Sequence, residues 1–218
     1  MPVTLGIYGA GGLGREVLDL AQVIHQATNR WEEIVFIVDN SAQSEIDGVP
    51  VYSFAQFTSA YKGAEVALGV GEPAARKLLF EKVEAAGFTL ATLIHPSAYV
   101  GHQSQVGRGS ILQYNAFVSC HVKIGEGALI QQLTYIGHDS EVGRFSVISS
   151  HASIAGHCVI GSETFIGLNV PVKEHVKIGS RTIVGMGACV VSHLEDGIIA
   201  IGTPAHELRK NEDYQVFK

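Results

Sequence analysis

The sequence has few cysteines and none at close spacing. Cys120, Cys158 and Cys189 stand far apart, are odd in number, and include no C-x-x-C pair. This pattern suggests neither a disulfide framework nor a zinc knuckle. We therefore expect no disulfide-bonded scaffold and no structural metal in this chain.

Long apolar runs, a signal peptide and an excess of basic charge are also lacking. No stretch approaches the ~20 apolar residues of a membrane span, and the start, MPVTLGIYGAGG, has no basic segment followed by a sustained apolar one. A net charge of −6 gives no footprint for nucleic acid or an anionic membrane. With 46% hydrophobic and 17% charged residues, the 218-residue chain predicts an ordered, cytoplasmic protein.

A six-residue repeat dominates the second half of the chain. Every sixth residue from Ile94 to Val190 is Ile, Val or Leu, without one insertion. The residue directly after each aliphatic position is often glycine. The residue four places after each aliphatic position is Ala, Ser, Thr, Cys or Val. A period of six fits neither a 3.6-residue helix nor plain alternating strands. It is typical of short parallel strands joined by tight turns and wound into a prism, in which residues 18 apart stack on successive coils.

The first ninety residues read as a small α/β unit. The apolar segment from Val3 to Tyr8 predicts a strand, GAGGLG follows it at Gly9, Gly11, Gly12 and Gly14, and REVLDLAQVIHQA predicts a helix. In that setting G-x-G-x-x-G can receive phosphate at the helix N-terminus. The same glycines can also serve only to pack strand against helix, so both interpretations stay open.

A second strand and its polar end complete the predicted nucleotide site. The segment EIVFIVDN predicts a buried strand that ends in Asp39 and Asn40, the place where dinucleotide folds carry a ribose-binding acid. We expect a further strand in AEVALGVG, a helix over Pro73–Ala86 and a strand over Thr89–Ile94 that enters the prism. Ninety residues supply one mononucleotide half, which favours a nucleotide-linked substrate over NAD. We predict two domains, residues 1–92 and residues 93–218, the second ending in a short tail.

The glycine-rich opening, IHPSA at Ile94–Ala98, the hexapeptides and GTPA at Gly202–Ala205 occur together. The chain thereby resembles the hexapeptide-repeat sugar acyltransferases, which include sialic acid O-acetyltransferases and bacillosamine-pathway nucleotide-amino-sugar N-acetyltransferases. The resemblance implies a Rossmann-like α/β domain followed by a left-handed parallel β-helix. It also implies acetyl-CoA as co-substrate and a homotrimer with sites between subunits.

The resemblance places a catalytic base in Y-I-G-H-D-S-E-V-G. His138 carries over as general base and Asp139 as its partner, while the Gly156 amide would receive the thioester oxygen. The spacing agrees, because 156 − 138 = 18 stacks Gly156 one coil beyond His138. Gln131 matches a family Asn near the acetyl group. We also expect His157, and Pro204 in the terminal stretch, to contact coenzyme A.

Two residues depart from the family pattern, and one column of residues is not explained by that pattern. The family's second active-site His falls on Val147, and a family Gly is replaced by His151. His121, Asp139, His157, His175 and His193 recur at intervals of 18 and predict a ladder along one edge.

Three functional hypotheses follow. The first is N-acetylation of a nucleotide-linked 4-amino-4,6-dideoxyhexose for surface glycan or lipopolysaccharide biosynthesis. The second is O-acetylation of sialic acid or a related sugar. The third is a zinc protein like γ-class carbonic anhydrase, although no two histidines here show the H-x4-H spacing of that class. The alternative to all three enzymes is a non-catalytic assembly protein, which would bind no acetyl-CoA and would tolerate loss of His138.

Overall fold

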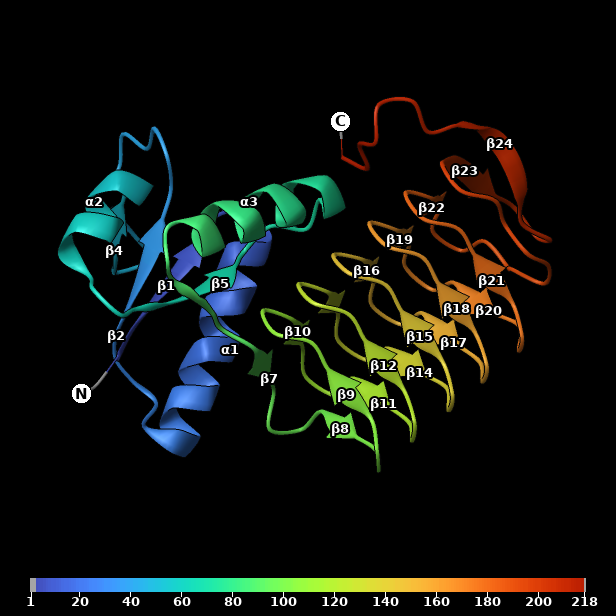
Figure 1. Cartoon of the computed structure of the whole chain (residues 1–218), viewed down its shortest axis with the longest axis horizontal. Helices are drawn as coiled ribbons and strands as arrows, with labels where there is room; N and C mark the ends of the chain where they lie inside the picture. The colour runs from blue at the N-terminus through green and yellow to red at the C-terminus, as the bar shows by residue number, and fades with distance from the viewer. Residues whose placement is uncertain (1–2, 218) are drawn as a thin grey trace.

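The computed structural model describes residues 3–217 and divides into an α/β layer and a prism (Figure 1). The outermost residues of the two predicted domains, 1–2 and 218, lie outside the described residues. The α/β layer is one six-stranded sheet in the order β3-β4-β2-β1-β5-β6, parallel except for the β3·β4 pair. Its elements are β1 (Val3–Tyr8), α1 (Gly12–Thr28), β2 (Trp31–Ile37), β3 (Glu45–Ile46), β4 (Val49–Tyr52), α2 (Phe54–Ala60), β5 (Glu65–Leu68), α3 (Pro73–Ala85) and β6 (Thr89–Leu90).

The strand predicted over Thr89–Ile94 is two strands. β6 completes the α/β sheet beside β5, whereas β7 (Leu93–Ile94) is the first strand of the prism. The expectation of one continuous strand was wrong because the chain leaves one sheet and enters another within two residues. The segment β3–β4–α2 had no prediction; its helix begins with a Ser53–Gln56 capping box.

The prism is a left-handed β-helix with three parallel sheets. We name one face by the helix that covers it and the other two by their outward side chains. The covered face is formed by β7, β10 (Ile111–Leu112), β13 (Leu129–Ile130), β16 (Val147–Ile148), β19 (Phe165–Ile166) and β22 (Ile183–Val184), and it continues into β23 (Ile198–Ile201) and β24 (His206–Lys210). The aromatic face is formed by β8 (Tyr99–Val100), β11 (Phe117–Val118), β14 (Tyr135–Ile136), β17 (Ser153–Ile154) and β20 (Pro171–Val172). The charged face is formed by β9 (Gln105–Val106), β12 (Lys123–Ile124), β15 (Glu141–Val142), β18 (Val159–Ile160) and β21 (Lys177–Ile178).

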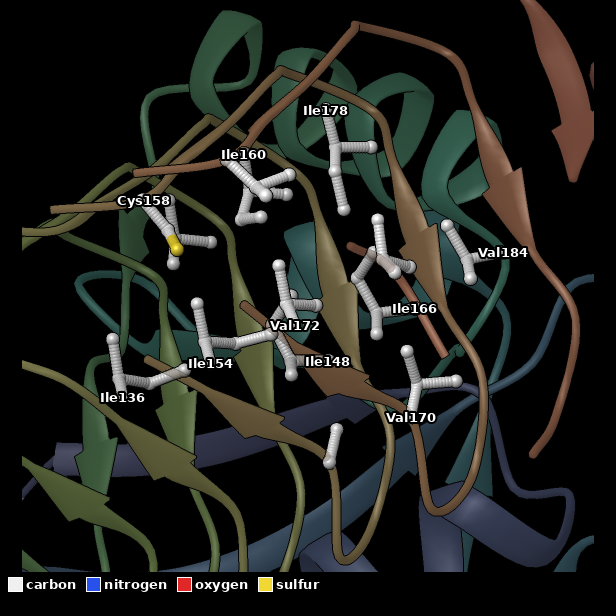
Figure 2. Close-up of a cluster of buried hydrophobic side chains, with 14 of the residues drawn as sticks. Ile136, Ile148, Ile154, Cys158, Ile160, Ile166, Val170, Val172, Ile178 and Val184 are labelled. Atoms are coloured by element: carbon white, nitrogen blue, oxygen red, sulfur yellow. The ribbon is translucent and has the colours of Figure 1, made fainter. Parts of the chain in front are cut away.

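The repeat predicted from the sequence sets this register. Strands pair with strands 18 residues on, as in Ile136 with Ile154 and Ile154 with Val172. The second residue of each strand is the aliphatic one, and in Figure 2 these side chains converge on the prism interior. Ile136, Ile154 and Ile166 are fully buried there.

The small polar residues four places after the aliphatic ones link neighbouring coils by hydrogen bonds. The Ser140 hydroxyl donates to the carbonyl of Ala155 at 3.1 Å and accepts from the amide of Cys158 at 3.0 Å. Ser146 makes the same pair of bonds with Gly161 and Thr164. Buried hydroxyls at this corner are therefore satisfied by the backbone of the next coil.

The first residue of each strand points outward, and the three faces differ in what meets it. On the covered face Leu93, Ile111, Leu129 and Val147 are buried in one cluster with α1. On the aromatic face Tyr99, Phe117 and Tyr135 stay exposed and stack on one another. On the charged face the outward side chains include Lys123, which pairs with Glu141.

A buried arginine joins the two layers. Arg76 of α3 is fully buried and donates to the carbonyls of Gly127 in the prism and of Leu68 and Val70 in the α/β layer. The aromatic rings of Phe80 in α3 and Phe145 in the prism make a T-shaped contact. These contacts fix the α/β layer against the covered face.

We expect Ile160→Ala to lower the free energy of unfolding by about 2–5 kcal/mol, because it leaves a cavity in the prism interior. Val159→Ala is the matched control, since Val159 is the neighbouring strand residue but points outward on the charged face. It should change stability by less than about 1 kcal/mol. Urea titration measures both values, and equal losses would contradict the assigned register.

Candidate active site

The turns of the prism form three edges, and one of them carries the predicted base. The histidine edge, between the aromatic and charged faces, consists of residues 101–103, 119–121, 137–139, 155–157 and 173–175. His138 and Asp139 lie on its third turn, directly after β14. Asp139 has a φ of 57°, the left-handed conformation that Asp, Asn and His adopt more readily than other side chains.

His138 and Asp139 form the pair expected of a base and its partner. His138 Nδ1 lies 2.7 Å from Asp139 Oδ2. This hydrogen bond, together with the charges of nearby histidines, outweighs slight desolvation and holds the pKa of Asp139 below its usual value. Asp139 is therefore ionised near neutral pH, and an ionised acceptor favours the tautomer with hydrogen on Nδ1. Nε2 is then left as the atom that can accept a proton.

Gly156 lies directly beside the imidazole, as the spacing predicts. A Cβ atom at residue 156 would stand 2.8 Å from both Cε1 and Nε2 of His138. Only glycine therefore fits this position while the imidazole keeps its place. Within residues 3–217, no acceptor takes a hydrogen bond from the Gly156 amide, so this N–H is available next to Nε2.

The predicted ladder is present over part of its length. The rings of His138 and His157 meet edge to face at 5.0 Å, and those of His157 and His175 stack at 4.8 Å. His157 Nε2 lies 3.9 Å from Asp139 Oδ2. His193 does not continue the ladder, because the last coil is two residues shorter. Ile178 pairs with Leu194, and His193 Nδ1 instead accepts from the backbone amide of Lys177.

His138, Asp139 and His157 lie close enough together to raise the question of a metal site. Zinc ligands stand about 2.0–2.1 Å from the ion, which places two tetrahedral ligand atoms about 3.3 Å apart. The 2.7 Å separation of His138 Nδ1 and Asp139 Oδ2 is a hydrogen-bond distance instead. The arrangement therefore favours a base with its partner over a zinc centre.

Gln131 and His151 lie on a different edge, and Val147 lies on the covered face. The glutamine edge, between the covered and aromatic faces, consists of residues 95–97, 113–115, 131–133, 149–151, 167–169 and 185–187. Gln131 Oε1 accepts from the Ser150 amide there, and strand β14 separates this turn from His138 within one chain. His151 is exposed on the same edge. Val147 is 1% exposed under α1, which explains why a polar side chain is absent from that position.

The glycine loop divides into packed and open positions. A Cβ at Gly14 would lie 2.1 Å from the carbonyl oxygen of Gly9, and Gly69 packs against both. Gly9 and Gly14 thus serve the close approach of β1, α1 and β5. Gly11 and Gly12 have open space around them, and the N-terminus of α1 has no side-chain cap. The packing interpretation therefore holds for Gly9 and Gly14, and ligand binding stays a prediction for Gly11 and Gly12.

Asp39 is held by partners that the sequence did not reveal. Its Oδ2 accepts from Tyr8 and Lys82, and its Oδ1 accepts from the Phe54 amide. Burial raises the pKa of Asp39, but hydrogen bonds from Lys82, Tyr8 and Phe54 outweigh it and lower the pKa to about 2. Both carboxylate oxygens are thus already engaged. Asn40, next to it, is exposed and lines a polar cavity of about 430 Å³ with Gln43 and Gln56.

Pro204 lies far along the prism from the α/β layer. It is exposed in the link between β23 and β24, at the C-terminal end of the coils (Figure 1).

None of the helices within residues 3–217 combines the length and apolar character needed to cross a bilayer.

We expect His138→Ala to raise the pKa of Asp139, because the substitution removes the hydrogen bond that lowers it most. His157→Ala removes only a charge interaction and should raise the pKa less. Carboxyl-carbon NMR titration of Asp139 in the wild type and both variants measures the two shifts. A larger shift in His157→Ala would contradict the pairing of His138 with Asp139.

Comparison with known proteins finds a family model and several solved structures that are similar to this chain. Residues 4–83 match the family described as the PglD N-terminal domain. WeeI from Acinetobacter baumannii AYE is 26% identical, with a TM-score of 0.88 over 94% of this chain and 100% of that chain. No curated protein sequence matches the chain significantly.

Two further solved structures carry functional names. A point mutant of perosamine N-acetyltransferase from Caulobacter crescentus, in complex with CoA and GDP-perosamine, is 27% identical, with a TM-score of 0.84 over 94% of this chain and 96% of that chain. The acetyltransferase domain of PglB from Neisseria gonorrhoeae FA1090, in complex with acetyl coenzyme A, is 28% identical, with a TM-score of 0.75 over 95% of this chain and 100% of that chain. Together with the fold and the repeat, these likenesses show that the chain is an acetyltransferase similar to the hexapeptide-repeat sugar acyltransferases.

Proposed function

We propose that this acetyltransferase moves the acetyl group of acetyl-CoA to the amine of a nucleotide-linked 4-amino-4,6-dideoxyhexose. The observation that carries the proposal is the contact of His138 with Asp139 on one side and Gly156 on the other. The relatives agree in class, since one is named a perosamine N-acetyltransferase and was solved with CoA and GDP-perosamine. The product would serve surface glycan or lipopolysaccharide biosynthesis in the cytoplasm.

The reaction is a direct attack without an acyl-enzyme. The acceptor nitrogen attacks the thioester carbonyl carbon, His138 Nε2 takes a proton from the amine, and the Gly156 N–H donates to the developing oxyanion. The C–N bond forms as the C–S bond breaks. The proton on the imidazole then passes to the departing thiolate. Asp139 holds the ring and stabilises its positive charge between these two transfers.

The α/β layer holds the nucleotide. The open positions Gly11 and Gly12 offer backbone amides at the N-terminus of α1, which is a favourable site for a diphosphate. Asn40 lines the neighbouring polar cavity and faces the nucleoside. Asp39 acts through Tyr8 and Lys82 and shapes this end of the sheet, since its oxygens are already engaged.

Three copies of the chain assemble with their aromatic faces turned inward. Tyr99, Phe117 and Tyr135 form an exposed stack, whereas the covered face is buried under α1. About a threefold axis parallel to the prism, the histidine edge of one copy meets the glutamine edge of the next at the same level. Gln131 then lies opposite the neighbour's His138, which accounts for its place on another edge.

Coenzyme A lies along the histidine edge. Its thioester end sits beside His138 and Gly156, and the pantetheine passes His157 on the next coil. Its adenine end reaches Pro204 at the C-terminal end of the prism. The stacking of β14 and β17 supports the first part of this path. Pro204 follows β23 on the glutamine edge, so the adenine end reaches the Pro204 of the neighbouring copy, whose glutamine edge meets this histidine edge in the proposed trimer.

A thiol-release assay tests the proposal with acetyl-CoA and UDP-, dTDP- or GDP-linked 4-amino-4,6-dideoxyhexoses. The wild type should release thiol with one of them, and His138→Ala should lower kcat/KM by about 10²–10⁴-fold because it lacks the base. Gly156→Ala should lose activity as well, since its Cβ displaces the imidazole.

His121→Ala is the matched control, because His121 lies on the same edge one coil earlier and forms no hydrogen bond or ring contact with His138 among residues 3–217. Its charge acts on Asp139 less than the hydrogen bond from His138 does. It should keep most of the activity. Release with sialic acid but with no amino sugar would replace the N-acetyltransferase with an O-acetyltransferase. Undiminished release by His138→Ala would remove His138 as the base.

We expect Phe117→Glu to break the trimer and abolish activity, because it places a charge in the stacked aromatic face. Val159→Glu makes the same kind of change on the charged face, where Val159 is similarly exposed at 38% against 40% for Phe117. Sedimentation velocity should show monomers for the first variant and trimers for the second. A trimeric, active Phe117→Glu would contradict the proposed interface.

A further inference from the structure

The C-terminal tail, residues 211–217, returns from the end of the prism to the α/β layer. In Figure 1 it runs back from β24 toward the N-terminal end of α3. Its first residue, Asn211, is 5% exposed, and it donates from its backbone amide to the carbonyl of Gly197 and from its side chain to the carbonyl of Arg181, each at 2.8 Å. The Arg181 guanidinium lies over the Tyr214 ring, 5.0 Å from its centroid. The start of the tail is thus attached to the prism.

The end of the tail binds the loop that follows β5. The backbone amides of Val216 and Phe217 both donate to Glu72 Oε2, at 2.9 Å and 3.2 Å. The other carboxylate oxygen, Oε1, is buried and has no hydrogen-bond partner within residues 3–217. The two tail amides are therefore the only hydrogen-bond donors to this carboxylate in that part of the chain. Because a carboxylate withdrawn from water needs hydrogen bonds to offset its lost hydration, the position of Glu72 depends on the tail.

The Phe217 ring lies beside the same loop and close to the glycine loop. It makes a T-shaped contact with Phe165 of the covered face, with the ring centroids 5.6 Å apart. A Cβ atom at Gly71 would stand 3.6 Å from the Phe217 ring and 3.4 Å from Leu13 Cδ2. The side chains of Phe217 and Leu13 thus both border Gly71. Since Leu13 directly follows Gly12, the tail ends next to the open part of the glycine loop.

The order of the sheet gives this place its meaning. From β1 the sheet extends through β2 on one side and through β5 on the other, so the topological switch point lies between β1 and β5. Open α/β sheets bind ligands outside the carboxyl ends of their strands at such a point. The two loops that meet there follow β1 and β5, and Gly69 of the second packs against Gly9 and Gly14 of the first. Their relative position sets the shape of the proposed diphosphate site.

We propose that the tail positions the nucleotide-linked acceptor, because it holds the loop 69–72 against the glycine loop in the arrangement that binds the nucleotide. The inference rests on the proposed function and assigns Glu72 and Phe217 to it as positioning residues. Neither lies on the histidine edge. Loss of the tail should therefore weaken acceptor binding and leave the chemistry at His138 unchanged.

The test compares the wild type with a chain truncated after Asp213, which lacks both amide donors and the Phe217 ring. Thiol release gives kcat and the two KM values, and calorimetry gives the affinity for UDP, dTDP and GDP alone. Truncation should raise KM for the nucleotide sugar, and Kd for the matching nucleoside diphosphate, by about tenfold, the effect of losing charge-assisted hydrogen bonds. The kcat and KM for acetyl-CoA should change less than about twofold, because only acceptor binding is affected.

Variants of Glu72 examine the contact itself. Glu72→Ala removes the acceptor of both tail amides and should weaken nucleotide binding as truncation does. Glu72→Gln keeps a side-chain carbonyl oxygen for them and should change the affinity less than about threefold. Because truncation and Glu72→Ala break the same contact, the doubly altered chain should lose no more affinity than either alone. Additive losses would contradict the contact.

Leu78→Ala is the matched control for Phe217→Ala. Leu78 is an apolar residue of α3 that is 65% exposed, against 61% for Phe217, and it belongs to neither loop. Phe217→Ala should weaken binding of the nucleoside diphosphate, and Leu78→Ala should leave it unchanged. Thermal unfolding of each variant checks that the fold is retained.

The outcomes separate this inference from the proposed function. Thiol release from a nucleotide sugar with unchanged KM after truncation would overturn the inference and leave the function. Equal losses in affinity for the nucleotide and for acetyl-CoA would also overturn it, because the tail would then support the whole molecule. Weaker nucleotide binding after truncation, in a protein that releases no thiol with any amino sugar, would support the inference and overturn the function. A wild type that binds no nucleoside diphosphate would overturn both the inference and the nucleotide-linked acceptor.

Discussion

The stacking of coils by backbone hydrogen bonds is the constraint on which the candidate site depends. The amide of Gly137 donates to Ile154 at 2.7 Å, and the amide of His157 donates to His138 at 2.9 Å. These bonds bracket the turn that carries the base and fix it over Gly156. The positions of the site's side chains are thus set by the backbone hydrogen bonds between successive coils. Placement on such a framework gives a base and an oxyanion donor a defined separation without a dedicated loop.

The same framework explains how one repeat serves three different surfaces. The inward residue of each strand must be aliphatic, but the outward residue is free to differ between faces. It is apolar and buried where α1 covers the sheet, aromatic and exposed at Tyr99, Phe117 and Tyr135 on the next face, and charged at Lys123, Glu141 and Lys177 on the third. Attachment of the α/β layer, the proposed contact between copies and contact with solvent thereby depend on one column of the repeat.

The repeat made the prism predictable, because each six-residue unit specifies one strand and one turn of its coil through local sequence alone. The stacking of Gly156 on His138 followed from subtraction alone, and the structure confirms it. The ladder failed at His193 because the last coil is two residues shorter, and the aliphatic column runs on to Val190 without a signal of that change. Several ladder residues also occupy the left-handed turn position, which favours Asp, Asn and His for backbone reasons.

The α/β layer was predictable in outline but not in its polar contacts. The strand and helix over Val3–Thr28 carry a strong periodic pattern, whereas Asp39 meets Lys82 across 43 residues of sequence with no motif to link them. A carboxylate after a buried strand indicates a ribose ligand in many folds, and here its oxygens are engaged by neighbouring side chains instead. Contacts between distant segments depend on how helices pack on the sheet, and a single sequence does not encode that in a local pattern.

The exposure of the proposed base is the strongest physical reason to propose a site shared between copies. The side chains of His138 and Asp139 are 50% and 43% exposed in one chain, and water at such a surface weakens the interaction of a hydrogen-bond donor with a developing oxyanion. A second surface must exclude that water before the Gly156 amide can stabilise the charge effectively. The aromatic face adjoins the histidine edge, so burial of Tyr135 between copies brings the neighbouring edge toward His138. In the proposed trimer, assembly and catalysis are one requirement, because the contact that hides apolar surface also encloses the reacting atoms.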